Sequence, residues 1–195
     1  MDEYNKTTDI DIDIYDRDKA IECLNCVDAS ILNDRSIRKH NVGIYLQDIP
    51  TFMNTGMSSI DYKEAGDYGF FKIDILNNTI YEQVESEEHL DRLLNTEPDW
   101  NLLVDDTVIS NLFQIHKYGS ELKKWKPNSV MKLAMFIAMI RPAKKHLLEC
   151  DSWKTVEDTI WEKPKDNTQH FFKKSHSIAY ANVLKIQLNL LNGIV

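Results

Sequence analysis

The chain has 195 residues, of which 43% are hydrophobic, and its formal net charge is −8. This content can build a buried core, and the length allows one large or two small domains. No apolar run reaches the roughly 18 residues of a membrane span, and the acidic N-terminus is unlike a secretory signal. We therefore expect a cytoplasmic protein with no membrane contact, and its three cysteines fit a reducing compartment better than a disulfide framework.

The charge is distributed unevenly along the chain. Residues 1–100 carry 22 acidic and 9 basic side chains, whereas residues 101–195 carry 9 acidic and 14 basic ones. This asymmetry is expected if the first half holds metal ions and the second half approaches phosphate. The alternative is an acidic protein with one basic face.

The first predicted element is an acidic strand over residues 9–14. Strict alternation places Asp9, Asp11 and Asp13 on one face of the strand and three isoleucines on the other. Neighbouring carboxylates on one face repel each other unless a cation lies between them. The pattern therefore indicates a divalent-metal site. The alternative is an exposed edge strand whose charges prevent aggregation.

A helix is predicted after this strand, with Asp16 or Asp18 as its N-cap. Its apolar positions follow helical spacing and are Ala20, Ile21, Leu24 and Val27. Cys23 and Cys26 form a CxxC pattern within this helix. Because the chain has no second such pair, zinc or redox chemistry is disfavoured there.

A basic cluster then leads into a short predicted strand over residues 42–46. The cluster consists of Arg35, Arg38, Lys39 and His40. A histidine in this setting is more typical of a packed or surface residue than of a ligand. Residues 50–69 contain Pro50 and three glycines, and they predict a loop.

The next strand is predicted over residues 70–76, with Lys72 and Asp74 on one face. If this strand neighbours the acidic strand, Asp74 joins the first carboxylates and Lys72 stands beside them. Two carboxylates from one strand and a third from another suit a two-metal site for nucleotidyl transfer. Lys72 would then neutralise phosphate.

From Ser86 onward the pattern is helical. Ser86 is predicted to cap a short helix through Leu94, and Asp105 or Asp106 to open a helix that Gly119 ends. Ser129 precedes a helix that is apolar on nearly every side and stops at Arg141-Pro142. Ser175 is the predicted cap of the last helix. The tryptophans of this half favour core or interface positions, although their lysine neighbours leave single-strand stacking open.

Taken together, the strands resemble the palm of the bacterial replicative DNA polymerase III alpha subunit, a family C polymerase. Residues 8–13 resemble its PDxDxDF strand, and residues 38–45 are similar to its histidine-rich stretch before a GVVI strand. Residues 69–76 are similar to GLLKxDxLG, which holds the family's third catalytic aspartate.

Three later segments are similar to fingers motifs of the same family, in the same order. Residues 112–115, 138–142 and 173–181 resemble FQLE, ALxRPGP and NKSHAxAYA, respectively. The resemblance thus covers residues 8 to about 185, and its shared order makes it more specific than any single segment.

The resemblance implies that Asp9, Asp11 and Asp74 are catalytic and hold two Mg²⁺ ions, and it leaves the role of Asp13 open. The residues it implies at nucleotide or phosphate are Lys72, Arg141, Lys174, Ser175 and His176. The implied partners are primer-template DNA, deoxynucleoside triphosphates and a separately encoded polymerase subunit or host replication protein.

Departures from the family pattern are also clear. The stretch before the acidic strand lacks the Gly-Ser motif that cradles the triphosphate, Thr8 replaces a proline, and Asn77 replaces a glycine. Because positioning and charge neutralisation supply most of phosphoryl-transfer catalysis, this absence bears on independent activity. The alternative is a catalytically inactive relic that binds DNA or serves replication as an accessory protein.

The expected fold is α+β in two parts. Residues 1–85 would form a small mixed, palm-like sheet that carries the carboxylates. Residues 86–195 would form a helical, fingers-like region.

Overall fold

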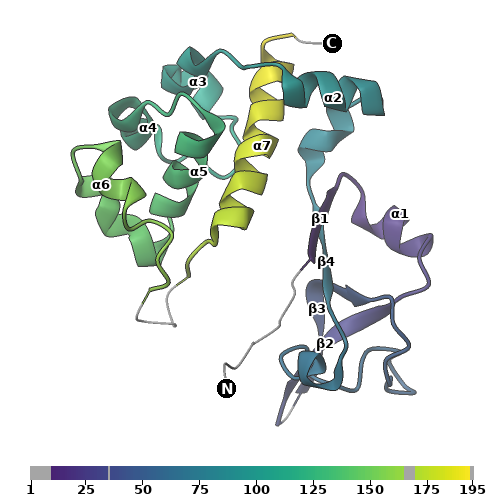
Figure 1. Ribbon diagram of the computed structural model, residues 1–195. Helices are drawn as coiled ribbons and strands as arrows, with labels where there is room; N and C mark the ends of the chain where they lie inside the picture. The colour runs from purple at the N-terminus through teal and green to yellow at the C-terminus, as the bar shows by residue number, and fades with distance from the viewer. Residues whose placement is uncertain (1–9, 35, 165–169, 194–195) are drawn as a thin grey trace. The chain divides into compact units, whose positions relative to one another are not determined.

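The structure is a computed structural model that describes residues 10–34, 36–164 and 170–193. The chain forms two compact units, Met1–Gln83 and Val84–Val195, which we call the N-terminal and the C-terminal unit. The first contains a four-stranded sheet and one α-helix, and the second is helical (Figure 1). The predicted α+β class with a small mixed sheet is confirmed. None of the helices in the described ranges is long and apolar enough to cross a membrane.

The sheet of the N-terminal unit has the order β1-β4-β3-β2. β1 runs parallel to β4, and the other neighbouring pairs are antiparallel. The strands are β1 (Ile10–Ile14), β2 (Val27–Asn33), β3 (Ser36–Tyr45) and β4 (Ile73–Asn77). The β2 edge is covered by residues 58–62, because the Tyr62 N–H donates to the Ser30 carbonyl oxygen at 3.1 Å. β1 forms the other edge.

Helix α1 (Arg17–Glu22) follows β1, and the Asp16 carboxylate caps it by accepting the Lys19 N–H at 3.1 Å. The prediction that this helix continues to Val27 is wrong. Val27 begins β2 and pairs with Tyr45, so sheet pairing overrides the local helical spacing. Cys23 is the C-cap residue of α1, and both Cys23 and Cys26 are free thiols.

Two small apolar clusters lie on opposite faces of the sheet. On the α1 side, Ile44, Ile73 and Ile75 are buried and pack with Ile14 and Ile21. The second cluster lies on the other face, beneath the chain that follows β3. Its buried members are Ala29, Tyr45, Ile49 and Ala65. The segments after β3 and β4 contain the 3-10 turns η1 (Ala65–Tyr68) and η2 (Thr79–Gln83).

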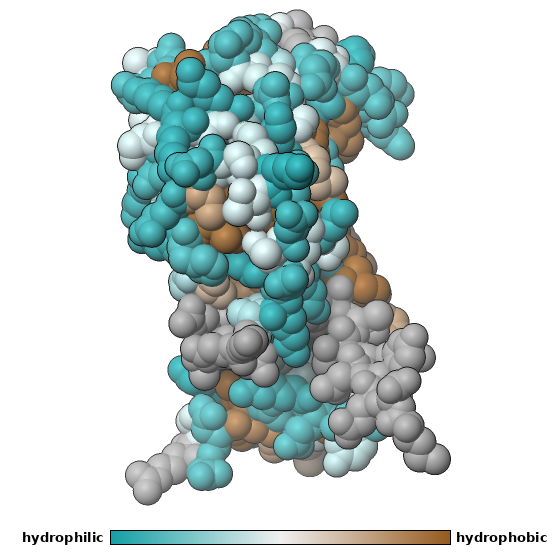
Figure 2. All heavy atoms as spheres, turned by 60° about the vertical axis from the view of Figure 1, so that its left-hand side comes forward, coloured by the Kyte–Doolittle hydropathy of each residue, from teal (hydrophilic) through white to brown (hydrophobic). Residues whose placement is uncertain are grey.

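The C-terminal unit has six α-helices and two 3-10 segments within the described residues. They are α2 (Glu87–Asn95), η3 (Trp100–Val104), α3 (Asp106–Ile109), α4 (Gly119–Trp125), α5 (Val130–Met139), η4 (Pro142–Glu149), α6 (Trp153–Glu157) and α7 (Lys174–Leu191). Helices α5 and α7 pack against each other in its core. The face of this unit shown in Figure 2 is mostly hydrophilic, since its apolar residues gather inside.

The predicted cap of α2 is confirmed, because Ser86 accepts the His89 N–H. α5 begins directly after Ser129, as predicted, and the Ser129 side chain caps it by accepting the Lys132 N–H. The long helix expected after Asp105 is wrong. α3 ends at Ile109, and Gly119 opens α4 instead of ending a helix. Gln114 has a φ of 59°, a left-handed conformation that interrupts helical backbone.

The predicted N-cap of the last helix is also wrong. α7 begins at Lys174, and Ser175 lies in its first turn. The preceding segment is fixed by tertiary contacts, since the His170 carbonyl accepts the Ala143 N–H at 3.2 Å and Phe172 is buried. The start of α7 is therefore determined by these tertiary contacts and not by capping from the Ser175 side chain.

Candidate active site

The central feature of the N-terminal unit is a pair of aspartates in adjacent strands. β1 and β4 pair in a register that sets Asp11 directly beside Asp74. Partners in register point to the same face of a sheet, and adjacent strands lie roughly 4.8 Å apart. The two carboxylates therefore leave the sheet side by side, on the face opposite the cluster of Ile44, Ile73 and Ile75.

Lys72 lies on the same face, two residues before Asp74. Its Nζ is 2.5 Å from both carboxylate oxygens of Asp74. The side chains are only 10% and 16% exposed, so this ion pair is largely shielded from water. A metal ion on Asp74 would have to compete with the Lys72 ammonium group.

Asp13 is set apart from this pair. It lies opposite Leu76 in the strand register, so no carboxylate of β4 faces it. Burial raises the pKa of the Asp13 carboxyl, and the charge of Asp11 raises it further. Burial likewise raises the pKa of Tyr81 to about 12, with a smaller contribution from Asp13.

The fit of this site to a metal ion is partial. Asp11 and Asp74 offer two adjacent carboxylates, which are the oxygen ligands that Mg²⁺ prefers. Within the described ranges, however, no three His, Cys, Asp or Glu side chains come close enough to hold an ion together. Asp9, the third predicted ligand, lies outside the described residues.

The position of β1 at the edge of the sheet also fits the alternative interpretation, in which the acidic face of an exposed edge strand prevents aggregation. Asp11 is exposed, and so are Ile10 and Ile12, at 43% and 42%. A row of charges on such an edge discourages pairing with other chains. Edge protection alone explains neither the register that sets Asp11 beside Asp74 nor the ion pair between Asp74 and Lys72.

Two residues near the carboxylates were missed as site residues. His40 was interpreted as a packed or surface residue and Gly43 was not singled out, yet both lie next to Asp74. Alternation along β3 would place His40 on the same face as Ile44, but an irregular register between β2 and β3 changes its direction. In the sequence, the signal at this position is the basic cluster that leads into the predicted strand. Such a cluster does not indicate that β3 contains a bulge.

In the C-terminal unit, Arg141 is held by an aromatic ring and an amide. Its guanidinium carbon lies 3.9 Å from the centre of the Phe172 ring, and Nη2 donates a hydrogen bond to Gln114 Oε1. Burial lowers the pKa of Arg141, although an arginine remains charged. Phe172 in turn stacks on Tyr180 at 5.3 Å, which ties Arg141 to α7.

The other predicted phosphate-binding residues occupy the first turn of α7. Lys174 and Ser175 are exposed, and His176 is half-buried with its ring edge-on to Phe172 at 6.1 Å. Gln187 of α7 accepts the Phe113 N–H at 2.9 Å and donates to the Asn111 carbonyl at 2.8 Å. Residues 112–115, 138–142 and 173–181 meet inside the C-terminal unit, because Phe113 stacks on Tyr180 at 5.8 Å and Gln114 accepts the hydrogen bond of Arg141.

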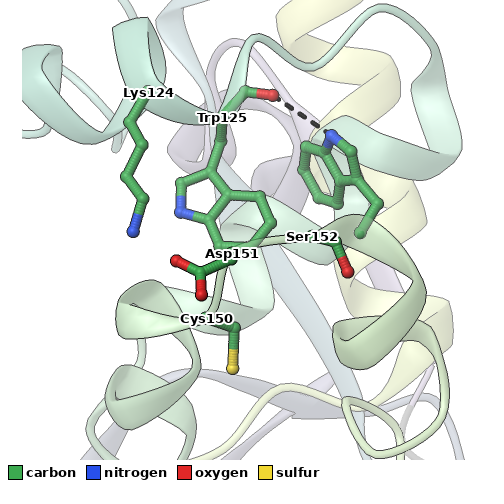
Figure 3. Close-up of a pocket in the computed structure, with 6 residues that line it drawn as sticks. Lys124, Trp125, Cys150, Asp151 and Ser152 are labelled. Atoms are coloured by element: carbon green, nitrogen blue, oxygen red, sulfur yellow. Dashed lines mark hydrogen bonds between the residues drawn. The ribbon is translucent and has the colours of Figure 1, made fainter.

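A small hollow of about 120 Å³ lies elsewhere in this unit (Figure 3). It is lined by Lys124, Trp125, Cys150, Asp151, Ser152 and Trp153. Trp125 and Trp153 contact each other edge to face at 4.8 Å, and Trp125 is only 6% exposed. Lys124 Nζ donates to the Leu148 carbonyl at 2.8 Å. Trp125 thus serves the core, as interpreted, and offers no open face to a nucleobase.

The charge asymmetry between the two halves of the sequence is different when the chain is divided at the boundary between the two units. The N-terminal unit carries 16 acidic and 8 basic side chains, whereas the C-terminal unit carries 15 of each. Acidic residues between 84 and 106 balance the basic remainder of the C-terminal unit. Attraction to phosphate would therefore depend on local groups such as Arg141 and Lys174, because this unit has no net positive charge.

Comparisons of the chain with protein-family models, curated proteins and solved structures find no match. The class that the fold and site define is therefore a mixed α+β protein with a paired-aspartate site on its sheet.

Proposed function

We propose that this chain is a nucleotidyltransferase fragment similar to the palm and fingers of the DNA polymerase III alpha subunit. It would add deoxynucleotides to the 3′ end of a primer on a DNA template. Its partner would be a separately encoded polymerase subunit or a host replication protein. The observation that carries this proposal is the register that sets Asp11 beside Asp74 with Lys72 on the same face.

The residues that would hold two Mg²⁺ ions are Asp11, Asp74 and Asp9, with Asp13 as a further candidate. In such two-metal sites the bound ions activate the attacking oxygen and steady the leaving group. Lys72 would balance the charge of Asp74 before substrate binds, and its ammonium group would then be available to a phosphate oxygen. The carboxylates come from adjacent strands, so the backbone ladder fixes their spacing.

The convergence of the three fingers-like segments is a second, independent support. Arg141 is oriented by Phe172 and Gln114, and His176 lies against the same ring. A half-buried and oriented guanidinium group suits recognition of phosphate oxygens. Lys174 and Ser175, which are exposed on the adjoining turn, would extend this surface toward the triphosphate or template.

Primer extension with a labelled primer-template tests the proposal. The purified chain, alone and with host replication extract, should extend the primer with Mg²⁺ or Mn²⁺, and Asp11→Asn or Asp74→Asn should abolish extension. Asp106→Asn is the matched control, because Asp106 also pairs with a lysine at 2.5 Å but lies in the C-terminal unit. Extension that survives both Asp11→Asn and Asp74→Asn would rule out the proposal.

A second candidate is an inactive relic that binds DNA or a polymerase partner. The close contact of Lys72 with both oxygens of Asp74 favours it, because an internal cation already neutralises this carboxylate. DNA binding without extension, unchanged in Asp11→Asn and Asp74→Asn, would be its signature.

A further inference from the structure

Arg141 is a half-buried charge that the described residues leave without a counter-ion. No carboxylate in the described ranges forms an ion pair with it, and its side-chain hydrogen bond runs from Nη2 to Gln114 Oε1. Its Nε is buried and has no hydrogen-bond partner there. A shielded charge without a counter-ion is unfavourable, so a bound anion would stabilise Arg141.

The backbone of Gln114 adopts a conformation that is rare for a residue with a side chain. Its φ is 59°, in the left-handed region that glycine reaches without strain. Its neighbours fix this position, because the Phe113 N–H donates to Gln187 Oε1 at 2.9 Å and Ile115 is fully buried. A glycine would suit the backbone at this position better than a glutamine does. The glutamine side chain therefore indicates a function in its contact with Arg141.

The Gln114 acceptor is neutral, which matters for the charge of Arg141. An amide oxygen accepts a hydrogen bond from the guanidinium group without cancelling its positive charge. A glutamate of the same length would form an ion pair with Arg141 and supply the counter-ion internally. In the N-terminal unit, by contrast, Lys72 is already paired with the Asp74 carboxylate. Gln114 thus orients a cation and leaves its charge for a ligand.

We propose that Gln114 is the positioning residue of the phosphate contact: it holds the Arg141 guanidinium group in place and keeps its charge available to a phosphate oxygen of the bound nucleotide. This inference rests on the proposed function and deepens it, since Gln114 itself does not touch the substrate. The Phe172 ring supports the guanidinium group at 3.9 Å, and the hydrogen bond to Gln114 limits its rotation. A side chain that is ordered before binding loses less entropy when the ligand binds.

Gln114→Gly removes this contact and relieves the backbone at the same time. The melting temperature should change little, because glycine adopts the left-handed conformation freely. The affinity of the full chain for dGTP with Mg²⁺, measured by calorimetry, should fall about tenfold or more. Lys126→Gly is the matched control, since Lys126 is the other non-glycine residue with a left-handed φ, 44°, in the described chain. It should bind dGTP normally, although it loses a positive charge.

Gln114→Glu separates positioning from a structural role. This variant retains the acceptor, so its melting temperature should equal or exceed that of the parent. Its affinity for dGTP should nevertheless fall, because the new carboxylate competes with phosphate for Arg141. A double-mutant cycle shows whether Gln114 acts through Arg141: in the Arg141→Met background, Gln114→Gly should cause no further loss of affinity. Normal binding by Gln114→Glu, or an additive loss in the cycle, would overturn the inference.

The outcomes distinguish this inference from the function on which it rests. If the parent extends primers and both Gln114 variants bind dGTP as the parent does, Gln114 has no positioning role and the polymerase proposal stands. If both variants lose affinity but the parent extends no primer, the positioning role stands and the polymerase proposal loses its reaction. If dGTP does not bind to the parent, both are overturned.

Discussion

The two units of this protein are stabilised in different ways. The C-terminal unit has one large apolar cluster that joins α5, α7 and the shorter helices, with Leu133, Phe136 and Leu184 among its fully buried members. The N-terminal unit has smaller clusters on either side of its sheet. Hydrophobic burial is roughly proportional to apolar area, so it contributes more to the C-terminal unit.

The difference shows how each unit can position polar groups. In the N-terminal unit, strand register and a bulge place Asp11, Asp74 and His40, and backbone hydrogen bonds fix their spacing. In the C-terminal unit, aromatic packing places Arg141. A core substitution should therefore affect the C-terminal unit most, whereas a charge substitution should affect the N-terminal unit.

The largest expected effect comes from Phe136→Ala in α5. Phe136 is fully buried, so its truncation should lower the free energy of unfolding of the C-terminal unit by about 3–5 kcal/mol. Tryptophan fluorescence during urea unfolding measures this unit, because all four tryptophans belong to it. Met131→Ala on the same helix, where the side chain is 41% exposed, should cost less than about 1 kcal/mol. Equal losses would contradict the assignment of the core.

Lys72→Met should cause the next largest loss of stability, and this loss should occur in the N-terminal unit. It leaves the shielded Asp74 carboxylate without its cation, which should cost about 3 kcal/mol. Amide NMR signals of the sheet during denaturation measure this loss. The double variant with Asp74→Asn should recover much of the stability. If the double-mutant cycle shows no coupling, the ion pair contributes little.

Helix caps provide a smaller test within the C-terminal unit. Ser129 accepts the Lys132 N–H at 3.2 Å, so Ser129→Ala should cost about 1 kcal/mol. Ser175 lies exposed inside the first turn of α7, so Ser175→Ala should change stability by less than about 0.5 kcal/mol. Thermal unfolding of both variants measures the difference. A larger loss for Ser175→Ala would restore Ser175 as the cap.

The smallest effect is expected for Asp13→Asn. The fold raises the pKa of Asp13, so its folded carboxyl holds a proton more tightly than the unfolded one. Stability from this group is therefore present at low pH and is lost as pH rises through its raised pKa. Asp13→Asn should be more stable than the parent at pH 7 by about 0.2–1 kcal/mol and equal to it near pH 3. Melting temperatures across pH measure this, and a parent that is more stable at pH 7 would contradict it.

Several helix caps could be predicted from the local sequence. The sequence predicts Ser86 as a cap and Asp16 as one of two candidates, with Asp18, because a cap needs only a short side chain and a helix beginning at the next residue. The helix expected to end at Gly119 failed because the left-handed backbone of Gln114 accompanies a hydrogen bond to Arg141, 27 residues away. Spacing within a segment contains no information about such a distant partner.

The alternation of isoleucine and aspartate by itself determined that the acidic residues share one face of β1, because side chains of a strand alternate every two residues. Only the tertiary structure decided that Asp11 stands beside Asp74, more than sixty residues later, and that His40 turns toward them. Strand pairing and bulges arise from hydrogen bonds between distant segments. A register shifted by one residue would have sent the carboxylates to opposite faces with the same local sequence.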